Sequence, residues 1–480
     1  MNPFLPEGVY IPDGEVHVFG DRVYLVGSHD RPGGPLFCME DYEIWSAPVD
    51  DLGAWESHGV AYRAEQDPYN DGSHPNRVRG AERGLHYLYA PDVCRGPDGR
   101  FYLYYCLDTV SRVGVAVADE PGGPYTFLDY VRTTRGEILG ERPDDLVQFD
   151  PAVLVDEGRV YLYSGNAPVN RFHKATGYRR NHSMVTELEP NMVTVKDGPH
   201  RLLPDVTESK GTTFEGHELF EASSIRRIGD TYYLVYSDIH AHNLAYATSN
   251  SPMGGFEYRG VLISNGDIGV DGRRSIMQAA MPIGNNHGCV EQIGGRWYVF
   301  YHRHTHGRQA SRQACAEPIE LNADGTFTRA RMSSSGLNGG PLPGTGTYSA
   351  RIASRLTTRR GGNTFSLSRD RFFPHLAQES TSDGPLQYVA NLHSGATAGF
   401  PSFAGLGRTL SVVTRSSGGG RLVVTTGAGQ RLAEIPVNRS SGWATSAAAT
   451  LSRPAEEDDV TLLLTYRGRG RLDLASFSLE

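Results

Sequence analysis

One short pattern of aromatic and aliphatic residues recurs five times before residue 303. The copy GDTYYLVYS shows it clearly, because the turn dipeptide Gly229-Asp230 precedes an alternating run that is typical of a hairpin arm in a β core. The intervals between the central tyrosines of the copies are 78, 59, 72 and 65 residues. Repeats at this spacing leave room for four strands each and predict a five-bladed β-propeller. The five tyrosines are Tyr24, Tyr102, Tyr161, Tyr233 and Tyr298.

The composition favours an all-β chain. Its 57 Gly, 28 Pro and 25 Tyr suit many short strands joined by tight turns, and 480 residues allow two or three domains. Chance recurrence of aromatic hairpins is the alternative explanation of the repeats. We disfavour it because the sequence that flanks each copy also repeats.

Charge, cysteine usage and hydropathy exclude several classes of protein. A net charge of -9 leaves no basic stripe of the kind that a phosphate backbone requires, so we expect no nucleic-acid partner. The five scattered cysteines show no CxxC spacing and indicate buried or incidental thiols. The start lacks a basic segment followed by an apolar one, and no run of eighteen apolar residues occurs. These features predict a cytoplasmic enzyme without a membrane partner, unless a leader has been removed.

One polar residue, in most copies an acid, stands ten to twelve residues before each central tyrosine. The innermost strand of every propeller blade lines the central channel, so residues at equivalent places should converge at one end of the axis. Like charges held together raise one another's pKa values and must be hydrated, paired or used. We therefore expect a functional pocket there. The five residues are Asp13, Asp92, Asp150, Glu221 and His287.

Two other stretches differ in composition from the repeats. The polar, turn-rich segment 69–84 is predicted to cover the channel mouth and narrow it to a pocket, with a disordered surface insertion as the alternative. The Gly, Ser and Pro-rich segment 333–345 is predicted to be a linker after a catalytic domain at 1–332. Alternating runs such as TLSVVTRS and VTLLLTYRG predict a second domain at 346–480, a jelly-roll-like β-sandwich.

Four segments, taken in order, resemble the motifs of glycoside hydrolase family 43, a family of five-bladed β-propellers. The likeness covers roughly residues 5 to 325, and Gly14 stands where the family more often has proline. The segments are YIPDGEVHVFGDRVYLVGSHD at 10–30, FDPAVLVDEGRVYLY at 149–163, FEASSIRRIGDTYYLVYS at 220–237 and NNHGCVEQIGGRWYVFYHRH at 285–304.

The resemblance implies that Asp13 is the general base, Glu221 the general acid and Asp150 the group that orients the acid and tunes its pKa. An inverting glycosidase needs one carboxylate to deprotonate water and one carboxylic acid to protonate the leaving oxygen. A third carboxylate can keep that acid protonated by charge repulsion. Capping or turn roles are the alternatives for all three. Glu218 lies close to Glu221 but breaks the spacing, and the family uses the aspartate at Asp92 structurally.

Arg312, in SRQACAEPIE, resembles an arginine that contacts sugar hydroxyls, with a surface salt bridge as the alternative. His287 resembles the family's central histidine. Family members often hold a hydrated calcium near that histidine, so the resemblance implies substrate contact and a structural calcium bound chiefly through water, with no other cofactor. His302, His304 and His306 alternate, so on a strand they share one face and form either a metal site or a polar channel rim.

The C-terminal region resembles a family 6 carbohydrate-binding module, a β-sandwich, through RLAEIPVNRSSGWATSAAATL and VTLLLTYRGRGRLDLASFSLE. Sugar-binding faces usually present exposed aromatic rings. The final strand instead has Leu472, Leu474 and Ser476, and Trp443 suits a core position as well as a ligand platform. We therefore favour a structural partner of the propeller over a sugar-binding module.

Together these features predict an inverting, exo-acting glycosidase that removes terminal α-L-arabinofuranosyl or β-D-xylosyl units from plant-type oligosaccharides. The same fold acting on galactosides is one alternative. A propeller that binds sugar without cleaving it is another, disfavoured because a binder needs no matched acid and base. A retaining, fructan-type hydrolase is disfavoured because its WMNDPN, RDP and EC segments are absent.

Overall fold

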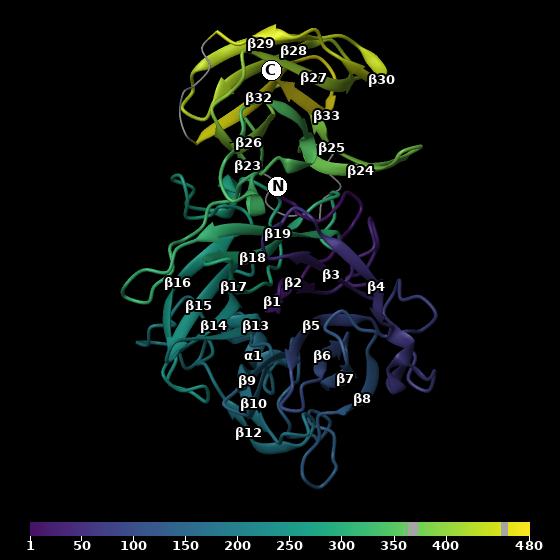
Figure 1. Cartoon of the computed structure of the whole chain (residues 1–480), viewed down its shortest axis with the longest axis vertical. Helices are drawn as coiled ribbons and strands as arrows, with labels where there is room; N and C mark the ends of the chain where they lie inside the picture. Colours follow the sequence, from purple (N-terminus) through teal and green to yellow (C-terminus); the bar gives the residue numbers. More distant parts are fainter. Residues whose placement is uncertain (360, 363–372, 453–458) are drawn as a thin grey trace.

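The computed structural model describes residues 1–359, 361–362, 373–452 and 459–480. They form a larger body with a smaller one above it, and both are built from β-strands (Figure 1). The prediction of an all-β chain, a five-bladed propeller followed by a β-sandwich, is confirmed. Within these ranges the single α-helix, α1 (Arg171–Thr176), has six residues, and no helix has the length and apolarity to cross a membrane.

Each blade is an antiparallel sheet whose strands follow chain order. The central tyrosine of every repeat lies on the second strand of its blade, beside the innermost strand. Blade 1 contains β1 (Glu15–Phe19), β2 (Arg22–Val26), β3 (Tyr42–Pro48) and β4 (Glu56–Tyr62). Blade 2 contains β5 (Leu88–Arg95), β6 (Phe101–Leu107), β7 (Gly114–Ala118) and β8 (Thr126–Tyr130). Blade 3 contains β9 (Ala152–Asp156), β10 (Arg159–Ser164), β11 (Met184–Leu188) and β12 (Val195–Arg201). Blade 4 contains β13 (Leu219–Ile228), β14 (Thr231–Asp238), β15 (Asn243–Ser249) and β16 (Glu257–Ser264). Blade 5 contains β17 (Val290–Ile293), β18 (Arg296–His304) and β19 (Arg312–Ile319).

The N-terminal segment lies along the outer edge of the three-stranded fifth blade. The side chain of Asn2 is fully buried and both donates to the carbonyl of Ala316, at 2.8 Å, and accepts from its N–H, at 3.0 Å. The N–H of Phe4 donates to the carbonyl of Ala314 at 3.3 Å. The chain start therefore completes the blade that closes the ring.

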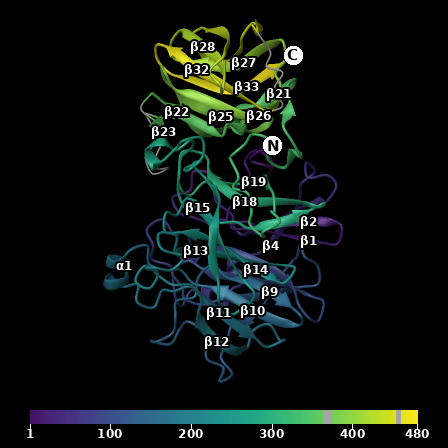
Figure 2. The ribbon, with the colours of Figure 1, turned by 90° about the vertical axis from the view of Figure 1, so that its left-hand side faces the viewer.

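The remaining strands form two sheets packed face to face above the propeller (Figure 2). Phe400 and Phe477, one from each sheet, meet in the core with ring centroids 4.7 Å apart. One sheet contains β20 (Leu342–Pro343), β22 (Arg355–Thr358), β23 (Gly361–Gly362), β26 (Thr397–Ala404), β28 (Gly420–Thr426), β29 (Arg431–Val437) and β32 (Val460–Gly468). The other contains β21 (Gly346–Ser349), β24 (His375–Thr381), β25 (Gly384–Leu392), β27 (Thr409–Ser416), β30 (Ser440–Thr445), β31 (Ala449–Thr450) and β33 (Leu472–Leu479).

Segment 333–345, predicted as a linker, is packed between the two bodies. Ser334 is fully buried, its carbonyl accepts from the N–H of Asn2, and its own N–H donates to the carbonyl of Pro401. β20 lies inside this segment and pairs in parallel with β26 of the sandwich. Buried side-chain amides add to the contact, since Gln387 of β25 donates to Gln313 of β19 at 2.9 Å. The two bodies therefore share a hydrogen-bonded interface.

Candidate active site

One cavity of about 430 Å³ lies at the end of the propeller axis, and it is lined by the five residues predicted for catalysis or substrate binding: Asp13, Asp150, Glu221, His287 and Arg312. Asp13, Asp150 and Glu221 come from blades 1, 3 and 4, while His287 and Arg312 come from blade 5. The three carboxylates thus converge on one pocket, whereas Asp92, which was expected there from the same spacing, does not line it.

Asp92 and Glu218, the two acids set aside from the sequence, do not line this cavity. Asp92 is fully buried between blades, where it contacts His17 at 2.7 Å and accepts from the N–H of Val153 at 2.7 Å. Glu218 accepts a hydrogen bond from the hydroxyl of Ser209. Both carboxylates have structural partners.

The backbone is strained where the catalytic candidates leave their loops. Asp13 has φ of 54° and Asp150 has φ of 42°, in the left-handed region that non-glycine residues rarely adopt. Both stand two residues before the innermost strand of their blades, and Ala222, next to Glu221, has φ of 68°. Strain of this kind persists only where surrounding contacts determine it, and it clusters at functional sites.

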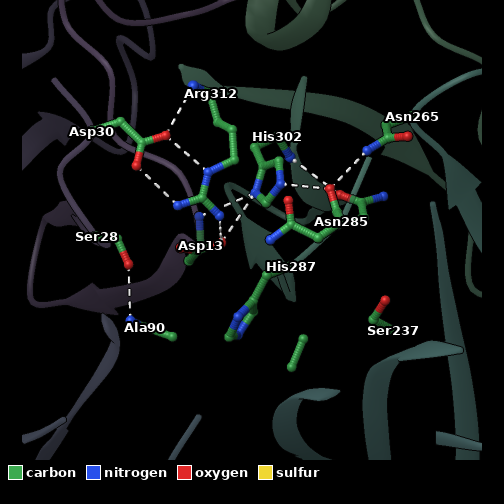
Figure 3. Close-up of polar contacts among 12 residues, drawn as sticks. Asp13, Ser28, Asp30, Ala90, Ser237, Asn265, Asn285, His287, His302 and Arg312 are labelled. Atoms are coloured by element: carbon green, nitrogen blue, oxygen red, sulfur yellow. Dashed lines mark hydrogen bonds and ion pairs between the residues drawn. The ribbon is translucent and has the colours of Figure 1, made fainter. Parts of the chain in front are cut away.

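Arg312 links two buried carboxylates (Figure 3). Its Nε and Nη2 donate to the two oxygens of Asp30 at 2.9 and 3.0 Å, and its Nη1 donates to Asp13 Oδ1 at 2.7 Å. The guanidinium lies over the ring of Phe37 at 4.7 Å and contacts Cys38 Sγ at 3.3 Å. Arg312 is 1% exposed, so the alternative of a surface salt bridge is wrong.

Asp13 is held ionised by its surroundings. Burial alone would raise the pKa of its carboxyl, but Arg312 and the neighbouring imidazoles of His302 and His287 outweigh burial and lower that pKa. His302 Nδ1 accepts from the N–H of Asp13 at 3.3 Å, and its Nε2 lies 2.8 Å from the carbonyl oxygen of Asn285 (Figure 3). This pairing fixes His302 as the neutral tautomer with its proton on Nε2.

Glu221 and Asp150 have the opposite electrostatic environment. Burial, then the charge of Asp13, raises the pKa of Glu221 to about 8, with Arg312 opposing. Burial and the charges of Glu221 and Asp13 raise the pKa of Asp150 as well. The N–H of Ala222 donates to Asp150 Oδ2 at 3.2 Å and stabilises that carboxylate, which opposes the increase in its pKa.

The residues around His287 do not form a direct calcium cage. Calcium takes six to eight oxygen ligands. The closest carboxylate contact of His287 is Asp150 Oδ2, 3.8 Å from Nδ1, and Asp13 is already paired with Arg312. Within the described ranges, no group of three metal-ligating side chains includes His287 or His302 to His306. A calcium bound chiefly through water stays a prediction.

Aromatic side chains form the walls of the cavity, and the sequence reasoning did not single them out. Phe37, Tyr89, Phe149 and Phe220 all line it. Segment 69–84 is described throughout, and none of its residues lines the cavity, so the prediction that it narrows the mouth is wrong. Ala81 of this segment instead belongs to the apolar cluster behind Phe37. The segment supports the wall from outside.

A pocket on a propeller axis that holds one carboxyl ionised and another protonated has the two protonation states that the acid and base of glycoside cleavage require. Fold and site thus define a glycosidase. The family model for glycosyl hydrolases family 43 matches residues 1–327. A xylosidase/arabinosidase from Thermoclostridium stercorarium is 44% identical over 100% of this chain and 98% of its own length. The chain belongs to glycoside hydrolase family 43.

More distant relatives agree with this assignment. A xylosidase/arabinosidase from Bacteroides ovatus is 27% identical over 62% of this chain and 87% of its own length. The crystal structure of a family 43 arabinoxylan arabinofuranohydrolase from Bacillus subtilis, in complex with cellotetraose, has a TM-score of 0.53 at 21% identity. The match covers 100% of this chain and 97% of that one, so the fold is shared over both bodies.

Proposed function

We propose that this enzyme removes terminal α-L-arabinofuranosyl or β-D-xylosyl units from oligosaccharides, acting from the chain end and with inversion of the anomeric configuration. The supporting observation is one axial pocket lined by an ionised Asp13 and a protonated Glu221. The substrate class is supported by the relative that is 44% identical over the whole chain, a xylosidase/arabinosidase.

In the proposed reaction, Asp13 takes a proton from a water molecule that attacks the anomeric carbon on the face opposite the leaving group. The new C–O bond forms as the glycosidic C–O bond breaks, and Glu221 gives its proton to the departing oxygen. Asp13 ends protonated and Glu221 ionised, so exchange with solvent restores both. Acid, base and water suffice, and the reaction needs no cofactor.

Arg312 has one donor left for the substrate in this scheme. A guanidinium carries five N–H groups. Two serve Asp30, one serves Asp13 and one points to Cys38, so one N–H on Nη1 remains at the cavity. This free donor supports the predicted contact between Arg312 and a sugar hydroxyl. Burial and the charge of Asp13 keep the proton on Glu221, and Asp150 is the orienting carboxyl whose charge interacts with that of Glu221.

Proton NMR of the first-formed sugar tests the stereochemistry, because an inverting enzyme releases the anomer opposite to the one cleaved. Release of the retained anomer would overturn the inverting assignment. A panel of aryl arabinofuranosides, xylosides and galactosides tests the sugar. Preference for the galactosides would replace the pentoside assignment, and binding of oligosaccharides without hydrolysis would identify a sugar-binding propeller.

The cytoplasmic location and the expected absence of nucleic-acid and membrane partners stay predictions from the sequence. We expect activity in the cytoplasmic fraction of the source cells, acting on imported oligosaccharides. Activity confined to the culture medium would contradict that expectation.

A further inference from the structure

A second group of functional side chains lies at the rim of the catalytic cavity. His217 precedes β13, Asp238 ends β14, and His240 stands in the turn that follows. One carboxylate oxygen of Asp238 lies 3.2 Å from His217 Nδ1, and the other lies 3.2 Å from His240 Nδ1. His240 also lines the cavity that contains Glu221. Two imidazoles and a carboxylate thus meet beside the catalytic acid.

The geometry of this group is fixed by further contacts. Asp238 is fully buried, and its carboxylate accepts from the N–H of His240 at 2.9 Å and from Asn243 Nδ2 at 3.0 Å. The ring of His217 stacks on Tyr258, with centroids 4.4 Å apart and an 8° angle between planes. Partners of this kind orient metal ligands in proteins. The side chains of His217 and His240 are 36% and 49% exposed, so solvent ions reach them.

No lysine or arginine in the described part of the chain forms an ion pair with Asp238; its ionic partners are the two imidazoles. A buried carboxylate without a lysine or arginine partner therefore lies beside two solvent-reachable imidazoles.

Two other clusters of metal-ligating residues differ in this respect. In one, Lys174 already pairs with Asp205, next to His182. In the other, Arg226 pairs with Glu15 at 3.1 Å, beside the buried Asp92. In each of those clusters a fixed cation of the protein already pairs with one of the carboxylates.

We propose that His217, Asp238 and His240 bind one divalent transition-metal ion of the Zn²⁺ type, and that the bound ion inhibits hydrolysis. Two imidazoles and one carboxylate suit zinc, and they leave a coordination position for water. His240 lines the cavity that contains Glu221, so an ion bound to its ring changes the wall beside Glu221. The inference concerns regulation of the site and does not depend on which sugar the enzyme cleaves.

Calorimetric titration of the full-length, chelator-treated protein with zinc chloride tests the proposal. We expect one ion per chain, and at least about tenfold weaker binding in His217→Ala. His217 does not line the cavity, so this variant should match the wild type in zinc-free hydrolysis and should resist inhibition by added zinc. His200→Ala is the matched control, because His200 pairs with Asp197 at 3.0 Å on the surface without a third ligand.

Equal zinc affinity in wild type and His217→Ala, or no stoichiometric binding to the wild type, would overturn the proposal. His217→Gln is the second variant, should loss of the ring from Tyr258 impair folding of the alanine form. Glu221→Gln separates the two sites. If it weakens zinc binding as much as His217→Ala does, the ion sits on the catalytic carboxyls and the proposal is wrong. Calorimetry measures binding alone, so failure of the proposed hydrolysis is seen separately.

Discussion

Replacing Glu221 with glutamine removes one proton from the site and changes little else in shape. General acid catalysis contributes about 10²- to 10⁴-fold, which corresponds to about 3 to 5 kcal/mol of transition-state stabilisation. The pKa of Glu221 is about 8, raised by burial and then by the charge of Asp13. At pH 7 about nine-tenths of the enzyme therefore carries the proton. We expect kcat/KM of the wild type to fall tenfold per pH unit above about pH 8.

The assay compares two kinds of substrate over a pH series. Xylo- and arabino-oligosaccharides have poor leaving groups that need the proton. On these substrates kcat/KM of Glu221→Gln should therefore fall by the full 10²- to 10⁴-fold, about the contribution of general acid catalysis, and its pH profile should lack the alkaline limb. Aryl glycosides with acidic phenols need little protonation and should lose far less. Glu218→Gln is the matched control, because Glu218 lies three residues away, buried and outside the cavity. It should keep the alkaline limb.

Equal loss on oligosaccharides and aryl glycosides would refute the acid role of Glu221. An alkaline limb that persists in Glu221→Gln would show that another group titrates. Either result would also contradict the assignment of Glu221 as acid and Asp13 as base from the opposite shifts of their pKa values.

Three further predictions concern the charges around the pocket. Arg312→Lys cannot bridge two carboxylates, so the pKa of Asp13 should rise. The acidic limb of kcat/KM should move up by about 1 to 2 pH units, which corresponds to one lost charge-assisted hydrogen bond. An unmoved limb would argue against Asp13 as the base. Asp30→Asn removes one member of a buried ion pair and should lower the free energy of unfolding in urea by about 3 to 5 kcal/mol, and an unchanged midpoint would contradict the pairing. Asp150→Asn removes the carboxyl whose charge interacts with that of Glu221, so the pKa of Glu221 should fall and the alkaline limb should move below pH 8. A limb that stays in place would show that burial and Asp13 raise that pKa without Asp150.

The repeat made the centre of the fold and the catalytic candidates predictable. Asp13, Asp150 and Glu221 stand at nearly constant distance from a central tyrosine, and propeller symmetry turns equal distance in sequence into convergence in space. Asp30 was missed, although it follows the first repeat strand directly. Its function depends on Arg312, 282 residues later, and no local pattern reports a pairing at that separation.

The backbone strain at the site and the aromatic residues of the cavity wall could not be predicted either, and the physical reason is a different one. The left-handed backbone at Asp13 is stabilised by tertiary contacts and opposes the local preference of an aspartate. Phe37 and Phe149 lie in loops whose paths depend on what packs behind them, so the sequence does not show that Phe37 lines the cavity and that segment 69–84 does not. The Gly, Ser and Pro content of 333–345 likewise does not show that Ser334 is buried and hydrogen-bonded to Asn2 and Pro401.

The pairing of Asn2 with Ala316 sets an order of events during synthesis. The two residues are 314 positions apart, so the segment around Asn2 waits for the last blade before it can pair with β19. At ribosomal rates of about 5–20 residues per second, that wait lasts roughly 15 to 60 seconds. Four blades can pack in sequence while the ring is still open, with the faces of the first and fourth blades unpaired. Chaperone capture of the nascent chain should therefore be concentrated in this interval and end when β19 emerges.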